Sequence, residues 1–152
     1  VGSEMCIRDR IEAFEPYLDI WAISSYPCFF FDRAADIPLD YYAPLLKHTD
    51  KPLAVAEGGC SSEDLEIHHG SFQDQIHYLH AIDDQLGGER LAFWIYLLYN
   101  DLNMESFAPL MREQGGEERI EGLSYFASIG LIGVDGRPKP ALTVWDRIRD
   151  PR

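Results

Sequence analysis

The sequence predicts an α/β fold in which short parallel strands alternate with helices. Three apolar runs, at residues 18–25, 53–56 and 91–98, have the length and composition of buried strands. An amphipathic segment lies in each of the two intervals between these runs. A right-handed strand–helix–strand connection makes the two strands parallel neighbours. We therefore expect one parallel sheet with helices packed on it.

Composition places the chain among globular proteins and excludes two classes of partner. Of its 152 residues, 46% are hydrophobic and 12% aromatic, and no apolar run approaches the roughly 20 residues that a membrane span needs. The formal net charge of −13 makes the chain a poor nucleic-acid binder, because phosphate contacts require clustered Lys and Arg. We therefore expect no membrane partner and no nucleic-acid partner, whereas neutral ligands such as sugars are compatible.

Residues 1–10, VGSEMCIRDR, do not fit the sequence that follows them. They lack the apolar stretch of a signal peptide, and we interpret them as a non-native or artefactual leader. Residues 11–19 look like the tail of a helix that has no beginning of its own. We therefore expect the natural protein to continue upstream of residues 11–152. The compartment stays open, and secretion or a periplasmic location is compatible with the sequence.

The first strand ends at Tyr26-Pro27 and leads into a loop with three consecutive phenylalanines, residues 29–31. These rings can line the rim of a cleft or plug the top of the fold, and we expect the plug. A helix is predicted from Ile37-Pro38 to about Thr49, because proline is favoured in a first helical turn. The residues expected on its buried face are Leu39, Tyr42, Leu45 and Leu46.

The second strand delivers a carboxylate, Glu57, to the point where its apolar run stops. A carboxylate at this boundary is costly to desolvate unless it is hydrogen-bonded or functional. Gly58-Gly59 follows and lets backbone or ligand approach closely. The simpler alternative is a strand that happens to end in a surface Glu.

Ser71 and Asp74 begin a second predicted helix, which runs to about Leu86 and stops at Gly87-Gly88. Its expected buried stripe is Phe72, Ile76, Leu79 and Leu86. Four histidines, His68, His69, His77 and His80, raise the question of a metal site. No H-E-x-x-H motif is present, and we predict solvated or partly packed histidines and no metal.

The third strand carries Trp94 and ends at Tyr99, Asn100 and Asp101. A long polar stretch follows, which we expect to be an irregular loop with a short helix near residues 106–112. Asp135-Gly136 predicts a turn. Residues 138–149 predict a last helix, with Leu142, Trp145 and Ile148 facing inward.

Cys28 and Cys60 lie two or three residues beyond the ends of neighbouring predicted strands. Neighbouring strands are about 4.8 Å apart and a disulfide needs Cα atoms within about 7 Å, so an oxidising compartment would permit a bridge. Two independent buried thiols fit the sequence equally well.

The strand ends also carry short motifs in a specific order: SYP at residues 25–27, VAEGG at 55–59 and AFW at 92–94. Together with the closing stretch 130–145, GLIGVDGRPKPALTVW, they resemble the C-terminal part of a clan A glycoside hydrolase, such as the endo-galactanase-like and cellulase-like families. The resemblance covers almost all of residues 11–152. It implies strands six to eight of a (β/α)₈ TIM barrel, truncated at its N-terminus, because a whole barrel needs about 250 residues.

The resemblance also implies a function, retaining hydrolysis of a β-linked polysaccharide or oligosaccharide without a cofactor. Glu57 would be the nucleophile, and the acid/base residue of strand four would lie in the missing part. Tyr26 would donate a hydrogen bond to Glu57, and Trp94 would form the floor under the sugar. Weaker substrate contacts are expected from Phe30, Asn100 and Asp101.

Two other functions stay open, an inactive barrel that only binds carbohydrate and another (β/α)₈ enzyme such as a metal-dependent hydrolase or lyase. A Glu at the end of strand four would favour the retaining hydrolase over the inactive barrel. The chain alone is expected to be inactive, because a partial barrel leaves two open sheet edges. The oligomeric state is not predicted.

Overall fold

The computed structural model describes residues 9, 11–65 and 68–150. The leader predicted at residues 1–10 lies outside the described residues, except for Asp9. The described elements are η1 (Glu15–Tyr17), β1 (Trp21–Ser25), η2 (Pro27–Phe29), η3 (Ala34–Asp36), α2 (Ala43–His48), β2 (Leu53–Gly58), α3 (Phe72–Leu86), β3 (Leu91–Trp94), α4 (Met104–Glu113), α5 (Glu117–Ala127) and α6 (Pro140–Arg149).

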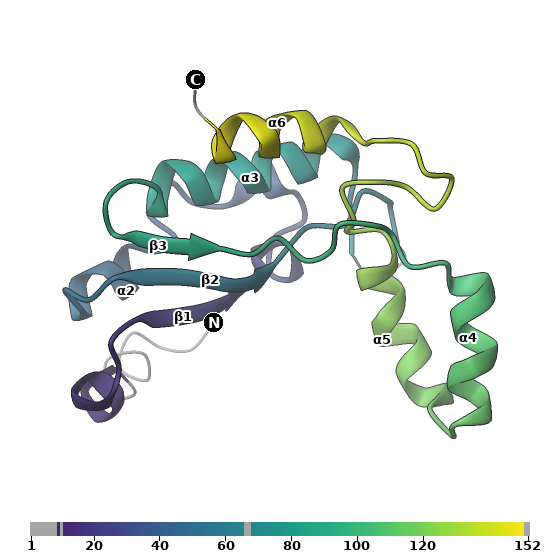
Figure 1. The fold of residues 1–152 in the computed structure, drawn as a ribbon, viewed down its shortest axis with the longest axis horizontal. Coiled ribbons are helices and arrows are strands. Elements are labelled where there is room, and N and C mark those ends of the chain that lie inside the picture. Colours follow the sequence, from purple (N-terminus) through teal and green to yellow (C-terminus); the bar gives the residue numbers. More distant parts are fainter. Residues whose placement is uncertain (1–8, 10, 66–67, 151–152) are drawn as a thin grey trace.

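The three strands form one parallel sheet in the order β1-β2-β3, which confirms the predicted α/β class and strand order. Helices α3 and α6 pack against each other and cover one face of this sheet (Figure 1). The covered face holds the core, which includes Val55 of β2 and Tyr78, Leu79 and Ile82 of α3. The other face is open, since Phe93 and Ile95 are 43% and 52% exposed.

A β-bulge in β2 decides which way Glu57 points. The register steps from Ile23 opposite Val55 to Ser24 opposite Glu57, so Ala56 is an extra residue. In a regular strand Glu57 would share a face with Val55, which is fully buried under the helices. The bulge therefore turns Glu57 to the open face.

The glycine after Glu57 shows the same orientation independently. A Cβ atom on Gly58 would collide with the hydroxyl of Tyr78, a residue of α3, and with the carbonyl of Ser25. Gly58 therefore faces the helices, and Glu57, the residue before it, faces away from them. Glycine is required here because the backbone of β2 approaches both groups too closely for a side chain.

Helices α4 and α5 form a hairpin that projects from the body on the side to which all three strands point (Figure 1). Helix α5 contradicts the irregular loop predicted for this stretch. Gly115, with φ of 72°, ends α4 and reverses the chain, and a regular helix follows from Glu117. Helix α4 is also longer than the predicted 106–112.

Two other element predictions and the predicted burial of one side chain need correction. The helix predicted from Ile37 begins only at Ala43, because turns occupy the residues before it and Pro44 suits a first helical turn. Leu39, predicted to be buried, is consequently 93% exposed. Strand β3 ends at Trp94 rather than at residue 98, although Ile95 and Leu97 still donate backbone hydrogen bonds to β2.

Helix α3 begins and ends as predicted, capped by Ser71 and stopped at Gly87, but its buried face is different. Phe72 is 50% exposed, while the polar Gln75 is completely buried. The Gln75 amide donates to the carbonyls of Ile129 and Gly130 at 3.1 and 3.2 Å, so it anchors the loop before α6. Hydrogen bonds of this kind are what makes a buried polar side chain tolerable.

Candidate active site

Glu57 lines a hollow of about 300 Å³ on the open face of the sheet. Tyr26 borders the hollow from the end of β1, and Leu97 and Leu98 border it from the segment after β3. The remaining wall residues are Leu102, Leu123 and Phe126. The structure thus brings Tyr26 and Glu57 together at the edge where parallel strands end, and surrounds the carboxylate with apolar side chains.

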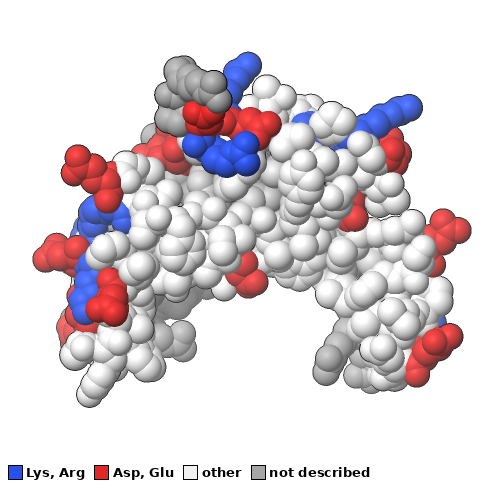
Figure 2. All heavy atoms as spheres, in the orientation of Figure 1, with Lys and Arg blue, Asp and Glu red and all other residues white. Residues whose placement is uncertain are grey.

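The α4–α5 hairpin supplies one wall of this hollow. Leu123 and Phe126 come from α5, and the base of the hairpin is tied by a backbone hydrogen bond from Leu102 to Ala127 of 3.0 Å. The Phe126 ring meets the Tyr26 ring edge-on, with 5.5 Å between centroids. In Figure 2 the body and the hairpin border a hollow whose visible walls carry few charged atoms.

The pKa of Tyr26 is raised by burial and by its position beside Glu57. Burial, the negative charge of Glu57 and its carboxylate acting as acceptor together raise the pKa of Tyr26 to about 12. The buried Tyr26 hydroxyl nevertheless has no partner of strict hydrogen-bond geometry among the described residues. The negative charge of Glu57 acts on the phenol whatever the exact orientation of the hydroxyl. Tyr26 is therefore a neutral donor, poised beside a carboxylate, at any physiological pH.

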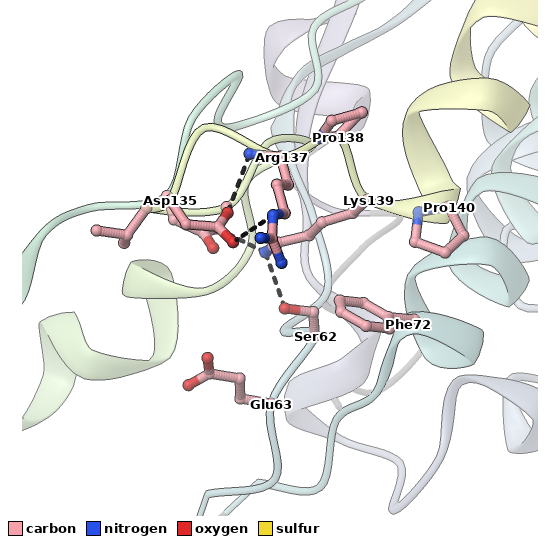
Figure 3. Close-up of a pocket in the computed structure, with 11 residues that line it drawn as sticks. Ser62, Glu63, Phe72, Asp135, Arg137, Pro138, Lys139 and Pro140 are labelled. Atoms are coloured by element: carbon pink, nitrogen blue, oxygen red, sulfur yellow. Dashed lines mark hydrogen bonds and ion pairs between the residues drawn. The ribbon is translucent and has the colours of Figure 1, made fainter.

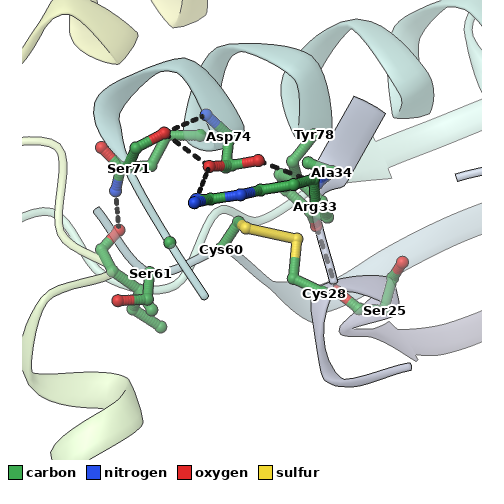
Figure 4. The surroundings of a disulfide bond; sticks show 12 residues. Ser25, Cys28, Arg33, Ala34, Cys60, Ser61, Ser71, Asp74 and Tyr78 are labelled. Atoms are coloured by element: carbon green, nitrogen blue, oxygen red, sulfur yellow. Dashed lines mark hydrogen bonds and ion pairs between the residues drawn. A yellow bond between two sulfur atoms is a disulfide. The ribbon is translucent and has the colours of Figure 1, made fainter. Parts of the chain in front are cut away.

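A disulfide between Cys28 and Cys60 joins the two loops that carry the site. The Cα atoms are 5.8 Å apart, and both residues are buried. Of the two alternatives that the sequence left open, the structure has the bridge. Figure 4 shows it below Asp74, whose carboxylate accepts from the Ala34 amide at 2.9 Å and from Arg33 at 3.2 Å. The bridge fixes the strand ends that present Tyr26 and Glu57.

Two of the three phenylalanines in the loop after β1 pack against other aromatic rings, which fits a plug better than the rim of a cleft. The Phe29 ring stacks on Tyr125 of α5, with 4.0 Å between ring centroids, and meets Tyr26 edge-on at 5.7 Å. Phe31 contacts Tyr41 at 5.6 Å. Phe30 is 61% exposed and is not among the residues that line the Glu57 hollow.

Trp94, Asn100 and Asp101 are not brought together with Glu57. The Trp94 ring lies on the helix side of the sheet, edge-on to Trp145 of α6 at 4.9 Å, and borders a different cavity beside Gly87. Asp101 forms an ion pair with Lys139 of 2.6 Å, and the exposed Asn100 bridges to Ile132. The alternation of the strand explains the position of Trp94, because Phe93 and Ile95 occupy the open face.

Three of the four histidines considered for a metal site contact other side chains instead. His69 pairs with Asp64 at 2.8 Å, His77 contacts Gln73 at 3.1 Å, and His68 meets the Phe29 ring at 4.9 Å between centroids. Within residues 9, 11–65 and 68–150, no three His, Cys, Asp or Glu side chains are grouped as a metal site would require. The same part of the chain has no helix long and apolar enough to cross a bilayer.

Sequence analysis missed the apolar wall of the hollow. Leu97 and Leu98 were assigned to a regular strand and Leu102 to an irregular loop, while no element was predicted for Leu123 and Phe126. The available signal was the apolar spacing of Leu123 and Phe126, three residues apart, which places both side chains on one face of a helix. The charged residues around that stretch obscured it.

Comparison with solved structures shows a likeness in fold. The chain superposes on a glycoside hydrolase family 17 β-1,3-glucanosyltransferase from Rhizomucor miehei with a TM-score of 0.52 and 18% identity, over 89% of this chain and 54% of that one. An active-site mutant of the R. miehei enzyme in complex with laminaritriose gives a TM-score of 0.49 at 16% identity, over 91% and 55% of the two chains. A glycoside hydrolase family 53 catalytic domain from Ignisphaera aggregans gives 0.46 at 19% identity, over 95% and 42%.

The first of these comparisons confirms, at the level of the fold, the resemblance predicted from the strand-end motifs. The structure is an α/β fold that matches part of a glycoside hydrolase, and this chain spans about half of the R. miehei chain. No protein-family profile matches the sequence, and no curated protein does.

Proposed function

We propose that this chain is the C-terminal part, about strands six to eight, of a (β/α)₈-barrel retaining glycoside hydrolase that acts on β-linked polysaccharides or oligosaccharides. One observation carries the proposal. The bulge at Ala56 turns the Glu57 carboxylate away from the core, at the carboxyl end of a parallel strand, where barrel enzymes hold their catalytic groups. The likeness in fold to the R. miehei enzyme, over about half of its length, supports the barrel assignment.

In the proposed reaction the Glu57 carboxylate attacks the anomeric carbon while a second carboxylic acid protonates the leaving oxygen. A covalent glycosyl ester forms, and water then cleaves it with the second residue acting as base. That residue would come from strand four, upstream of this chain. In the whole protein its carboxyl group should lie about 5 to 5.5 Å from that of Glu57, the separation that retaining enzymes use.

Tyr26 supports this role of Glu57. Because the phenol stays neutral up to a pKa of about 12, it can donate a hydrogen bond to the carboxylate throughout the working pH range. Nucleophilic attack requires a free carboxylate oxygen, and a neutral phenol offers the carboxylate a donor that can orient it. The apolar wall of Leu123 and Phe126 suits the C–H face of a sugar ring, a role that the sequence assigned to Trp94.

The proposal is tested by Glu57→Gln in the full-length protein that carries this chain. The amide keeps the shape of the side chain but cannot attack, so turnover of β-glucans and β-galactans should fall by about a thousandfold or more while binding persists. Glu57→Gly should regain activity when azide replaces the lost nucleophile. Glu89→Gln, a change at an exposed position, is the matched control.

Two outcomes would decide against the proposal. Turnover that survives Glu57→Gln at near wild-type rate would exclude Glu57 as the nucleophile. A full-length protein that binds these polysaccharides and turns none of them over would favour the inactive carbohydrate-binding barrel instead.

A further inference from the structure

Another cavity, of about 520 Å³, lies apart from the Glu57 hollow and shares no lining residue with it. We call it the Phe72 pocket, and its main polar and aromatic lining residues are Ser62, Glu63, Phe72, Asp135, Arg137 and Lys139 (Figure 3). Its size falls within the range of about 300 to 1,000 Å³ typical of small-molecule sites.

The floor of the Phe72 pocket is a buried ion pair. Lys139 and Asp101 are 5% and 7% exposed, and the Lys139 ammonium lies 2.6 Å from the Asp101 carboxylate. The same ammonium donates to the Ser62 hydroxyl at 2.8 Å and to the Ser128 carbonyl at 2.9 Å. An ammonium has three donors, so Lys139 is fully used within the protein and leaves none for an anionic ligand.

One wall is an aromatic ring in an unusual position. Phe72 is the first residue of α3 and is 50% exposed, although the helix pattern predicts a buried side chain. Figure 3 shows its ring near Ser62 and Pro140, bordering the cavity. A half-exposed ring beside a cavity provides an apolar surface with a polar surrounding, which suits a ligand that has both kinds of surface.

The rim of the Phe72 pocket carries acidic and basic side chains, which accept and donate hydrogen bonds. Glu63 is exposed, and the Arg137 guanidinium lies 3.4 Å from the Asp135 carboxylate, with both side chains more than half exposed. Three carboxylates (Glu63, Asp101, Asp135) face two cations (Arg137, Lys139), an excess of one negative charge. The pocket therefore disfavours anions and offers acceptors and donors to hydroxyl groups.

The Phe72 pocket is at the same end of the sheet as Glu57. Ser62 follows the end of β2 by four residues, a span of at most about 14 Å, and Asp101 follows β3. A polymeric ligand held at Glu57 could therefore reach this pocket with another part of its chain.

We propose that the Phe72 pocket binds a neutral sugar ring, which stacks on Phe72 and whose hydroxyl groups bond to Glu63, Asp135 and Arg137. The inference shares the ligand class of the proposed function but needs no chemistry at Glu57. It makes the pocket a second carbohydrate site, which holds a distant unit of the same polysaccharide.

The test measures binding by the full-length Glu57→Gln protein, in calorimetric titrations with β-1,3- and β-1,4-linked gluco- and galacto-oligosaccharides. Phe72→Ala in that background should weaken the binding of the preferred oligosaccharide about tenfold, and Glu63→Gln should weaken it less. Phe14→Ala, which removes an exposed ring that borders neither cavity, is the matched control and should leave Kd unchanged. Inorganic phosphate should not compete.

Two results overturn the inference without touching the proposed function: equal affinity in Phe72→Ala and its parent, or competition by phosphate. An absence of saturable binding would overturn the inference and would also contradict the persistent binding that the proposed function expects of Glu57→Gln. Conversely, the proposed function fails if Glu57→Gln keeps its turnover, and the effect of Phe72→Ala on binding is then unaffected. A normal melting temperature for Phe72→Ala, expected for a half-exposed residue, shows that the protein has folded.

Discussion

The two faces of the three-stranded sheet use the same strands for different purposes. On the covered face, Val55 and Trp94 pack against α3 and α6, with Tyr78 and Trp145 as their aromatic neighbours. On the open face, Phe93 and Ile95 are exposed and Glu57 lines a hollow. Covered positions therefore contribute mainly to stability, and open positions are available for chemistry. The bulge at Ala56 moves one residue from the first group to the second.

The largest expected effect comes from adjacent residues on opposite faces, Trp94 and Phe93. Trp94→Ala should lower the free energy of unfolding by about 3 to 5 kcal/mol, because it leaves a cavity against Trp145. Phe93→Ala removes an exposed ring and should cost less than about 1 kcal/mol. Urea unfolding of both variants measures the difference. A small loss for Trp94→Ala, together with a raised KM in the full-length protein, would restore Trp94 to the sugar-binding role that the sequence predicted.

The Cys28–Cys60 disulfide joins the segments that follow β1 and β2, at the edge of the sheet where Glu57 lies. Its two cysteines are 32 residues apart in the sequence. Replacing both cysteines by alanine should lower the free energy of unfolding by about 3 to 4 kcal/mol, mainly because the unfolded chain gains freedom. A reducing agent should produce a similar loss in the wild-type protein and none in the double variant. A wild-type protein that is insensitive to reduction would show that the bridge does not form.

A third comparison uses two glycines. Gly58→Ala should cost about 1 to 3 kcal/mol, because the added methyl group meets Tyr78 and the Ser25 backbone on the covered face. Gly122→Ala in α5 meets nothing within 4 Å and should stabilise the protein by up to about 1 kcal/mol, because alanine is the better helix former. Thermal unfolding of the two variants gives the signs. Equal effects would mean that Gly58, and with it Glu57, is oriented differently.

Local patterns in the sequence predicted the strands, their order and Glu57 at a strand end, because these depend on runs of adjacent residues. The orientation of Glu57 was not predictable, since the bulge at Ala56 exists only when β1 and β2 pair. Helix α5 was missed because charged residues masked its apolar face. The burial of Gln75 arises from contacts with a loop more than fifty residues away. The sequence permitted the disulfide but could not decide between a bridge and two free thiols.

The smallest expected effect is a shift in the ionisation of Tyr26, which reports directly on its distance from Glu57. Burial is the first cause of its raised pKa of about 12, and the Glu57 carboxylate is the second. Removing that charge in Glu57→Gln should therefore lower the pKa of Tyr26 without returning it to the ordinary value of about 10. The difference in phenolate absorbance between each protein and its Tyr26→Phe counterpart isolates this one titration.

The same shift fixes the direction of the pH dependence. Because the folded protein favours the neutral phenol, the stability that Tyr26 contributes is fully present below about pH 10, where the unfolded phenol titrates, and is lost as the pH rises towards 12. Burial raises the pKa of Tyr42, Tyr78, Tyr96 and Tyr125 as well, so they add to this alkaline loss. Wild type and Tyr26→Phe should therefore differ in how stability declines above pH 10. A Tyr26 titration that is identical in wild type and Glu57→Gln would mean that the two side chains do not meet, and the assignment of Tyr26 as the donor to Glu57 would be wrong.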